Sequence, residues 1–240
     1  MFKPVRFASI TLVLALILTP LPLVFAKTSK EIYQKKREEM VTKQIEARGV
    51  KDEKVLEAMR KVPRHKFVSD KYKSSAYYDR PLPIECGQTI SQPYIVGLMS
   101  ELLEPKRKDK VLEVGTGSGY QAAVLSPIVK KVYTIEIFEE LGTSAKKRLN
   151  DLGYKNVEVK IADGYYGWEE NAPFDCIIVT CAAGYVPPPL LEQLKEGGRM
   201  VIPVGAPFLV QSLMLIEKKN GKIISHSICP VRFVPLLGKH

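Results

Sequence analysis

Apolar positions in the second half of the chain form short runs that alternate with helix-like segments. The runs predict strands over Val111–Val114, Lys131–Glu136, Val157–Ala162, Phe174–Thr180 and Arg199–Val204. Segments with helical spacing of apolar residues lie between them, over Tyr120–Leu125, Glu139–Leu152 and Pro187–Leu194. Strands that alternate with helices predict an α/β fold with a mostly parallel sheet and helices on both faces. The nearly continuous apolar run at 174–180 places that strand near the centre.

The C-terminal part of the pattern changes from alternating strands and helices to a hairpin. Two further runs, Leu209–Glu217 and Lys222–Val231, flank the segment Lys218–Gly221. Its Asn-Gly pair, Asn220-Gly221, is a strong signal for a tight turn between antiparallel strands. We therefore expect an antiparallel hairpin at the edge of the otherwise parallel sheet.

The N-terminal half predicts helices that are packed beside the sheet. A charged, helix-prone run over Lys27–Arg48 ends at Gly49, and Asp52 is a plausible N-cap for a second helix through Met59. Residues 64–83 have the composition of a loop. Pro93 suits the first turn of a third helix that runs to Leu102, with Ser91 or Gln92 at its cap. These helices form an N-terminal appendage to the core.

Residues 1–26 have the layout of a secretory signal peptide. Lys3 and Arg6 form a basic start, Ile10–Leu18 is apolar, and Ala26 precedes a plausible cleavage point. The apolar stretch is short for a spanning helix, which needs about 20 residues. We expect export, with an uncleaved membrane anchor or a wrongly assigned start as alternatives. The expected units are residues 1–26, an N-terminal helical and active-site segment at 27–104, and a core at 105–240 that forms one compact domain with 27–104.

Composition and charge exclude several classes of function. A hydrophobic content of 45% is ordinary for a globular domain, and no repeat or low-complexity segment occurs. The net charge is +10, of which Lys3 and Arg6 contribute two, but the lysines are spread along the chain. We therefore expect a solvated basic surface and no nucleic-acid partner. The four cysteines lack the close spacing of a zinc site, so we expect no metal.

A glycine turn directly follows the strand at 111–114. Gly115, Gly117 and Gly119 stand at alternate positions, and Glu113 lies two residues before the first of them. A dinucleotide fingerprint would need glycine at position 120, which holds a tyrosine. The pattern instead resembles motif I of the S-adenosylmethionine-dependent methyltransferases with a Rossmann-like fold. That resemblance implies that Glu113 faces the cofactor's ammonium and that the turn leaves room for its methionine chain.

Acidic residues end the next two predicted strands. Glu136 lies 21 residues after Gly115, where a carboxylate can accept both ribose hydroxyls of a nucleoside. Asp163-Gly164 follows the third strand, at the corner that lies beside adenine in such folds, and Thr180 closes the fourth. The expected S-adenosyl-L-methionine-binding residues are Glu113, Gly115, Thr116, Gly117, Ser118, Gly119, Glu136, Asp163, Gly164 and Thr180.

The residues after the fourth strand argue against methylation of a nucleobase. Adenine and cytosine amino-methyltransferases typically place Asn or Asp there, followed by Pro-Pro and an aromatic residue. Here that place reads Thr180-Cys181-Ala182-Ala183, and the prolines at 187–189 come too late.

Several segments together resemble the protein-L-isoaspartate O-methyltransferase family. They are Gln88-Thr89-Ile90-Ser91-Gln92-Pro93, the glycine turn, Asp163-Gly164, Pro173-Phe174-Asp175, Gly197-Gly198-Arg199 to Pro203-Val204-Gly205, and Val231-Arg232-Phe233-Val234-Pro235-Leu236. They run in the family's order from about residue 30 to residue 237. The Thr-Ile-Ser-x-Pro and Arg-Phe-Val-Pro-Leu segments are specific to this family, whereas the glycine turn is not.

The resemblance implies a repair reaction. The family methylates the free α-carboxylate of L-isoaspartyl residues in damaged proteins, and the ester then collapses to a succinimide. Its active-site serine corresponds to Ser91, and the hydroxyl of Thr89 lies in the same segment, so both are candidate catalytic residues. The implied partners are isoaspartyl peptides and damaged proteins, and we expect a monomer.

Two alternatives and one conflict stay open at this point. The chain could methylate RNA or a small molecule instead, for which the net charge is the only support. It could also be a binding protein that kept the fold, although Glu113, Glu136, Asp163 and Ser91 argue against that. Family members are normally cytosolic, where S-adenosylmethionine is made, so export or anchoring through residues 1–26 conflicts with the cofactor's supply, and a cytoplasmic location is the alternative.

Overall fold

A seven-stranded sheet organises the part of the chain that the computed structural model describes, residues 1–2 and 28–239. The strand order is β5-β4-β3-β6-β7-β8-β9. The strands are β3 (Lys110–Val114), β4 (Lys131–Glu136), β5 (Val157–Ile161), β6 (Phe174–Val179), β7 (Leu194–Val204), β8 (Gln211–Lys219) and β9 (Lys222–Val231). The first five in this order are parallel, and β8 and β9 form an antiparallel hairpin at the edge. The predicted fold class and the central position of β6 are confirmed.

The order in which strands are added to the sheet reverses between β3 and β6, which are parallel neighbours. From β3 it moves outward through β4 to β5, and it then returns to the other side of β3 as β6. In parallel sheets such a switch point leaves a crevice at the carboxyl ends of the two neighbouring strands, where ligands bind. The predicted glycine turn directly follows β3, and Thr180 directly follows β6.

Three helices connect the strands: α4 (Tyr120–Leu125), α5 (Glu139–Asp151) and α6 (Pro188–Gln193). The last differs from the prediction, because α6 ends at Gln193 and β7 already begins at Leu194. Leu194 pairs with Phe174, and the pairing then resumes between Arg199 and Cys176. Gly197 and Gly198 therefore lie inside an irregular stretch of strand, where the backbone approaches closely: a Cβ at Gly198 would lie 2.7 Å from the Lys195 carbonyl.

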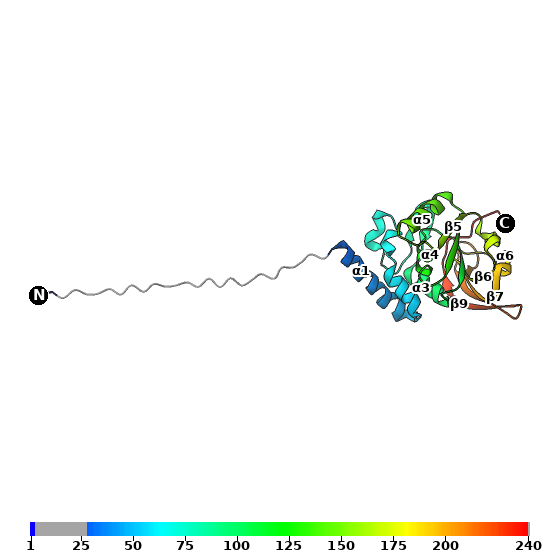
Figure 1. The fold of residues 1–240 in the computed structure, drawn as a ribbon, viewed down its shortest axis with the longest axis horizontal. Helices are drawn as coiled ribbons and strands as arrows, with labels where there is room; N and C mark the ends of the chain where they lie inside the picture. Colours follow the sequence, from blue (N-terminus) through cyan, green and yellow to red (C-terminus); the bar gives the residue numbers. More distant parts are fainter. Residues whose placement is uncertain (3–27, 240) are drawn as a thin grey trace.

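The N-terminal helices form where the sequence predicts them. α1 (Ser29–Met40) begins with a capping box between Thr28 and Glu31, continues through a π-helical and a 3₁₀ turn, and ends at Gly49 with φ of 101°. In α2 (Glu53–Lys61) the Asp52 side chain accepts from two backbone N–H groups of the first turn. Figure 1 shows α1 at one end of the body and α6 with the C-terminus at the other.

Both faces of the central strands of the sheet are buried. On β3 and β6 alternate side chains point to opposite faces, so that Val111 and Ile178 join one apolar cluster and Leu112 and Ile177 join the other. The first cluster also contains residues of the N-terminal helices, among them Met40, Ile45, Leu56, Met59 and Met99. The appendage therefore shares a core with the sheet.

The segment before α3 (Pro93–Leu102) is more ordered than the predicted loop. Two 3₁₀ segments, Arg64–Lys66 and Asp70–Ser75, precede β1 (Leu82–Pro83), which pairs antiparallel with β2 (Thr89–Ile90). His65 is buried, stacks on Tyr33 at 3.8 Å between ring centroids, and hydrogen-bonds the Tyr77 hydroxyl. The pairing with β1 holds the strand that leads into Ser91.

The prediction that residues 1–26 export the chain or anchor it in a membrane is corrected. Within residues 1–2 and 28–239, no helix is long and apolar enough to cross a membrane, so the anchor finds no support. The segment on which the prediction rests lies, from residue 3 to residue 27, outside the described residues.

Candidate active site

The glycine turn is fixed by the neighbouring strand. The backbone N–H groups of Gly115 and Thr116 both donate to the Ile135 carbonyl, at 2.9 and 3.1 Å. Gly115 has φ of 95°, and a Cβ there would lie 2.5 Å from the Thr180 Oγ1 atom. Glycine is therefore required at position 115 by conformation and by space. The glycines leave part of the turn's backbone without side chains at the carboxyl end of β3, as the sequence predicts.

Glu136 joins this turn to the start of the next helix. Its Oε2 accepts the Gly117 N–H at 2.7 Å, and its Oε1 accepts the Phe138 N–H at 3.1 Å. The side chain is 5% exposed and lines a cavity of about 60 Å³. A carboxylate held by two backbone donors at this place has lone pairs left for the hydroxyls of a ribose.

Glu113 lies beneath the turn in different surroundings. It is fully buried, and no hydrogen bond of normal geometry reaches either carboxylate oxygen among the described residues, although the Thr134 hydroxyl and the Ala122 N–H lie near enough to oppose the rise in its pKa. Burial, together with the charge of Glu136, raises its pKa to about 8. It lines a small cavity of about 30 Å³ together with Thr89 and Ser91. An unpaired buried carboxylate fits a ligand that brings a cation, so the site suits the ammonium of S-adenosylmethionine.

Three predicted cofactor-binding residues form hydrogen bonds to other groups of the protein through their side chains. The Thr116 hydroxyl pairs with that of Thr134 at 2.7 Å, and the Ser118 hydroxyl accepts the Tyr120 N–H. The Thr180 hydroxyl donates to the carbonyls of Val114 and Gly115. These side chains hold the turn in shape, while Thr116, Ser118 and Thr180 still line the cavities around it.

Asp163 and Gly164 lie at the carboxyl end of β5, against the end of β3. A Cβ at Gly164 would lie 2.5 Å from the Val114 side chain, so this corner packs directly on the central strand. Asp163 caps a 3₁₀ turn by accepting the Tyr165 N–H at 3.0 Å. Its second oxygen accepts the Lys239 N–H at 3.2 Å, so the C-terminal segment also contacts it.

The cavity above Glu136 has walls that the sequence did not reveal. Gln88, Phe138, Leu236 and Leu237 line it together with the predicted residues. The C-terminal segment reaches it because Leu236 donates its N–H to the Ala182 carbonyl, and Ala182 donates to that of Val234. The Arg-Phe-Val-Pro-Leu segment was noticed as a family feature, but no local signal in the sequence places it against this cavity.

Thr89 and Ser91 lie where the cavities meet. Thr89 lines both cavities described above, and Ser91 lines the small one with Glu113. Both residues also line an open groove of about 380 Å³, whose other walls include Ile95, Val231 and Phe233. Thr89 and Ser91 thus lie between a small polar cavity and a larger groove.

The start of α3 is not free to bind a substrate carboxylate, although the N–H groups of a helix N-terminus are a natural site for one. Asp79 already occupies it: one oxygen accepts the Tyr94 N–H at 3.0 Å, and the other accepts from the Gln92 side chain and from Arg48. Gln92 rather than Ser91 is the N-cap residue. Ser91 is thus not used to cap the helix.

Arg64 holds the backbone of Ser91 from below. It is fully buried, its Nη2 donates to the Ser91 carbonyl at 2.7 Å, and its Nε donates to the Ala76 carbonyl at 2.8 Å. Its guanidinium lies 4.8 Å from the centroid of the Tyr120 ring. Burial lowers its pKa to about 10, so it stays charged at neutral pH. Sequence reasoning missed this residue, because nothing near Arg64 marks it as buried.

No group of three or more His, Cys, Asp or Glu side chains that could hold a metal occurs among the described residues. All four cysteines are free thiols, and Cys176 and Cys181 are buried. Burial raises the pKa of the Cys181 thiol, next to Thr180, so it is neutral and a poor nucleophile.

Comparisons with known proteins agree with this geometry. The family model for protein-L-isoaspartate(D-aspartate) O-methyltransferase matches residues 35–240. The chain is 59% identical over 211 residues to protein-L-isoaspartate O-methyltransferase 1 of Nitrosospira multiformis, covering 87% of this chain and 89% of the relative. It is 60% identical over 190 residues to the protein of the same name in Cupriavidus necator, covering 79% and 73%.

Two solved structures share the fold across most of the chain. A protein-L-isoaspartate O-methyltransferase superposes with a TM-score of 0.77 at 31% identity, over 85% of this chain and 66% of that one. A structure assigned as the Plasmodium falciparum enzyme, in complex with S-adenosyl-L-homocysteine, superposes with a TM-score of 0.72 at 27% identity. The match covers 84% of this chain and 98% of that one.

The sheet order, the glycine turn and the carboxylates at the strand ends define an S-adenosylmethionine-dependent methyltransferase with a Rossmann-like fold. Within that class, the chain belongs to the protein-L-isoaspartate(D-aspartate) O-methyltransferase family. It is therefore an enzyme that uses S-adenosyl-L-methionine, and the alternative of a non-catalytic binding protein is set aside.

Proposed function

We propose that the enzyme transfers a methyl group from S-adenosylmethionine to the free α-carboxylate of L-isoaspartyl residues in damaged proteins. The observation that carries the proposal is the position of Thr89 and Ser91, which line both the small polar cavity with Glu113 and the larger groove. A donor in the cavity and a carboxylate in the groove would meet at these two hydroxyls.

The residues around the cavities fit the parts of the cofactor one by one. We assign the ammonium to Glu113, the methionine chain to the turn Gly115–Gly119, and the ribose hydroxyls to Glu136. The corner at Asp163-Gly164, with the apolar wall of Leu236, would receive the adenine. When bound, S-adenosylmethionine supplies a methyl group on a positively charged sulfonium sulfur.

The substrate carboxylate needs orientation rather than activation. A carboxylate has a pKa near 4, so it is already a nucleophile at neutral pH and no general base is required. Ser91 and Thr89 can orient it by donating hydrogen bonds. Because the carboxylate loses its charge as the ester forms, a cationic clamp would favour the reactant over the transition state, whereas neutral hydroxyls avoid that penalty. Arg232 lines the groove at its exposed side and is available for the substrate backbone.

One assay tests the proposal. Labelled methyl transfer is compared between a peptide with one L-isoaspartyl residue and the same peptide with normal aspartate. We expect base-labile label on the isoaspartyl peptide alone. Label on the aspartyl peptide, or on RNA supplied in the same reaction, would contradict the assigned substrate.

We also propose that residues 27–104 and 105–240 form one domain and that the enzyme is a monomer. The shared apolar cluster of N-terminal helices and sheet supports the first point. Sedimentation equilibrium over a hundredfold range of concentration tests the second, with a mass near 26.9 kDa expected throughout for the full chain.

A further inference from the structure

We propose that three residues beside the groove, Phe208, Leu209 and Val210, bind an apolar side chain of the substrate next to the isoaspartyl residue. We call them the apolar tip. The inference rests on the proposed function and extends it, because it states which damaged segments the enzyme prefers. Apolar residues beside the lesion would raise the enzyme's efficiency, and polar ones would not.

The apolar tip is unusually exposed. Phe208, Leu209 and Val210 are 85%, 63% and 54% exposed. In the described part of the chain they form the longest run of consecutive exposed large apolar residues. A contiguous apolar patch in water marks a binding surface, because its burial by a partner releases water from all three side chains together.

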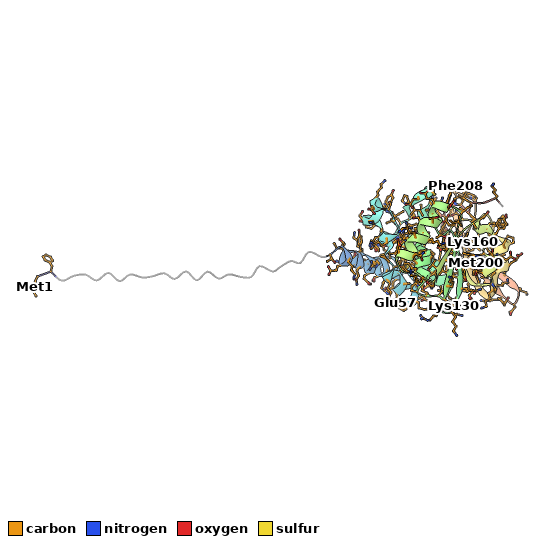
Figure 2. All side chains as sticks on the ribbon, turned by 45° about the horizontal axis from the view of Figure 1, so that its top comes forward. Met1, Glu57, Lys130, Lys160, Met200 and Phe208 are labelled. Carbon is orange, nitrogen blue, oxygen red and sulfur yellow. The ribbon has the colours of Figure 1, made fainter. Side chains whose placement is uncertain are left out.

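The backbone beneath the apolar tip is held in place. The Gln211 side chain is 1% exposed, its Oε1 accepts the Phe233 N–H at 2.9 Å, and its Nε2 donates to the Ala206 carbonyl. The Leu209 N–H donates to the same carbonyl. Phe208 has φ of 63°, a left-handed conformation that is rare outside glycine. Figure 2 shows Phe208 at the edge of the body, so this braced turn presents the ring to solvent.

The apolar tip continues the proposed substrate groove. Val210 lines the same groove of about 380 Å³ as Thr89 and Ser91, and Phe233, to which Gln211 ties the turn, lines it too. A segment whose carboxylate reaches Ser91 lies along this groove, so its residues beside the lesion pass the tip. The occupant that fits is an extended peptide with an apolar side chain.

This arrangement would favour damage in unfolded segments. Native surface loops are mostly polar, whereas a segment that has left a protein core exposes apolar side chains. An isoaspartyl residue in such a segment offers both the carboxylate for Ser91 and a side chain for the tip. The apolar tip would thus direct the enzyme to proteins that damage has partly unfolded.

The test uses peptides that differ only beside the lesion. Each contains one L-isoaspartyl residue, with phenylalanine, serine or glycine at each of three positions on either side. For the wild-type enzyme we expect phenylalanine in at least one position to raise kcat/KM about tenfold over serine, through KM. In the double variant Phe208→Ser/Leu209→Ser this preference disappears, while the all-glycine peptide is methylated at the wild-type rate.

A matched control separates recognition from a general loss of apolar surface. Ile223→Ser/Ile224→Ser changes two exposed apolar residues of β9, which pair with Lys218 and Glu217 at the far end of the hairpin. The control should keep the phenylalanine preference, and both variants should keep the wild-type thermal midpoint.

Several results would overturn the inference. The first is a wild-type enzyme that methylates the phenylalanine and serine peptides equally well. The second is a phenylalanine preference that survives in Phe208→Ser/Leu209→Ser. The third is a loss of kcat/KM in that variant that is as large for the all-glycine peptide as for the phenylalanine peptides. Self-association that the tip substitution abolishes, with an unchanged peptide profile, would assign the patch to a second copy of the chain. No methylation of any isoaspartyl peptide by wild type would refute the proposed function itself, and this inference with it.

Discussion

Glu113 and Glu136 end neighbouring parallel strands but have opposite surroundings. Two backbone N–H groups hold Glu136, whereas no hydrogen bond of normal geometry reaches the fully buried Glu113 carboxylate among the described residues. Burial raises the pKa of Glu113 to about 8, so the ligand-free enzyme keeps this carboxyl neutral at pH 7. A bound ammonium would reverse the balance and favour the charged form.

Cofactor affinity should therefore depend on pH. Because the ammonium pairs with ionised Glu113, we expect the Kd of S-adenosylmethionine to fall about tenfold per pH unit between pH 5.5 and 7.5. Isothermal titration calorimetry at several pH values measures this. In Glu113→Gln the Kd of S-adenosylmethionine should be higher and should not change with pH. A pH-independent Kd in the wild type would contradict the assignment of the ammonium to Glu113.

The same carboxyl should destabilise the ligand-free enzyme at high pH. Its pKa in the folded state, about 8, lies above the unfolded value of 4.5, so folding takes up a proton between these values and wild-type stability falls as pH rises. Glu113→Gln removes this dependence. We expect the stability difference in favour of the variant to grow by on the order of 3 kcal/mol from pH 5 to pH 8 in urea unfolding. A difference that stays constant over this range would show that Glu113 does not titrate.

Ser91→Ala should separate turnover from cofactor binding. The hydroxyl orients the substrate carboxylate and, in the proposed arrangement, only borders the cofactor. We expect kcat to fall about a hundredfold, in line with the loss of one oriented donor, while the Kd of S-adenosylmethionine changes less than threefold. Ser74→Ala, an exposed serine in a 3₁₀ segment, serves as control. Unchanged turnover would remove Ser91 from the mechanism.

At the level of elements, local patterns predicted what local forces determine. Alternating apolar runs, the caps at Asp52 and Gly49 and the turn at Asn220 all act within a few residues, and the elements form there. The sequence could not show that Asp79 occupies the start of α3, because that contact joins separate segments. The start of β7 was missed for a similar reason: its first residues are strand only through pairing with β6.

Substitution of Arg64 tests how a contact between segments that are distant in sequence supports the site. Its guanidinium donates to the carbonyls of Ala76 and Ser91 at once, which a single ammonium cannot reproduce in the same plane. We expect Arg64→Lys to lower stability by about 2 kcal/mol and kcat about tenfold, with little change in cofactor affinity. Denaturant unfolding and steady-state kinetics measure this, with exposed Arg80→Lys as control. Loss of stability with unchanged kcat would make the role of Arg64 purely structural.

For the whole molecule, topology explains why the sequence could bring the residues at the strand ends together but could not predict the proposed substrate groove. Parallel strands bring Glu113, Glu136, Asp163 and Thr180 to one edge of the sheet, so their order in the sequence was enough. The groove depends on where the N-terminal segment with Ser91 and the C-terminal segment with Phe233 meet. No periodicity encodes where these segments meet, and Leu209 and Val210 of the apolar tip fall within the strand that the sequence predicts over Leu209–Glu217, although β8 begins at Gln211.

The packing of the N-terminal helices against the sheet also predicts how the enzyme unfolds. Residues of α2, including Leu56 and Met59, share a buried cluster with Val111 of β3 and Ile178 of β6, so opening α2 alone would expose the same apolar surface that stabilises the sheet. We therefore expect one cooperative unit: slow amide exchange in α2 and β6 should report the same free energy of opening, within about 1 kcal/mol. Trp168, the chain's single tryptophan, lies in the cluster on the opposite face, and its fluorescence should follow the same transition in denaturant. If α2 opened several kcal/mol more readily than β6, residues 27–104 would be a separate unit that docks on the sheet, and the position of Ser91 would depend on that docking.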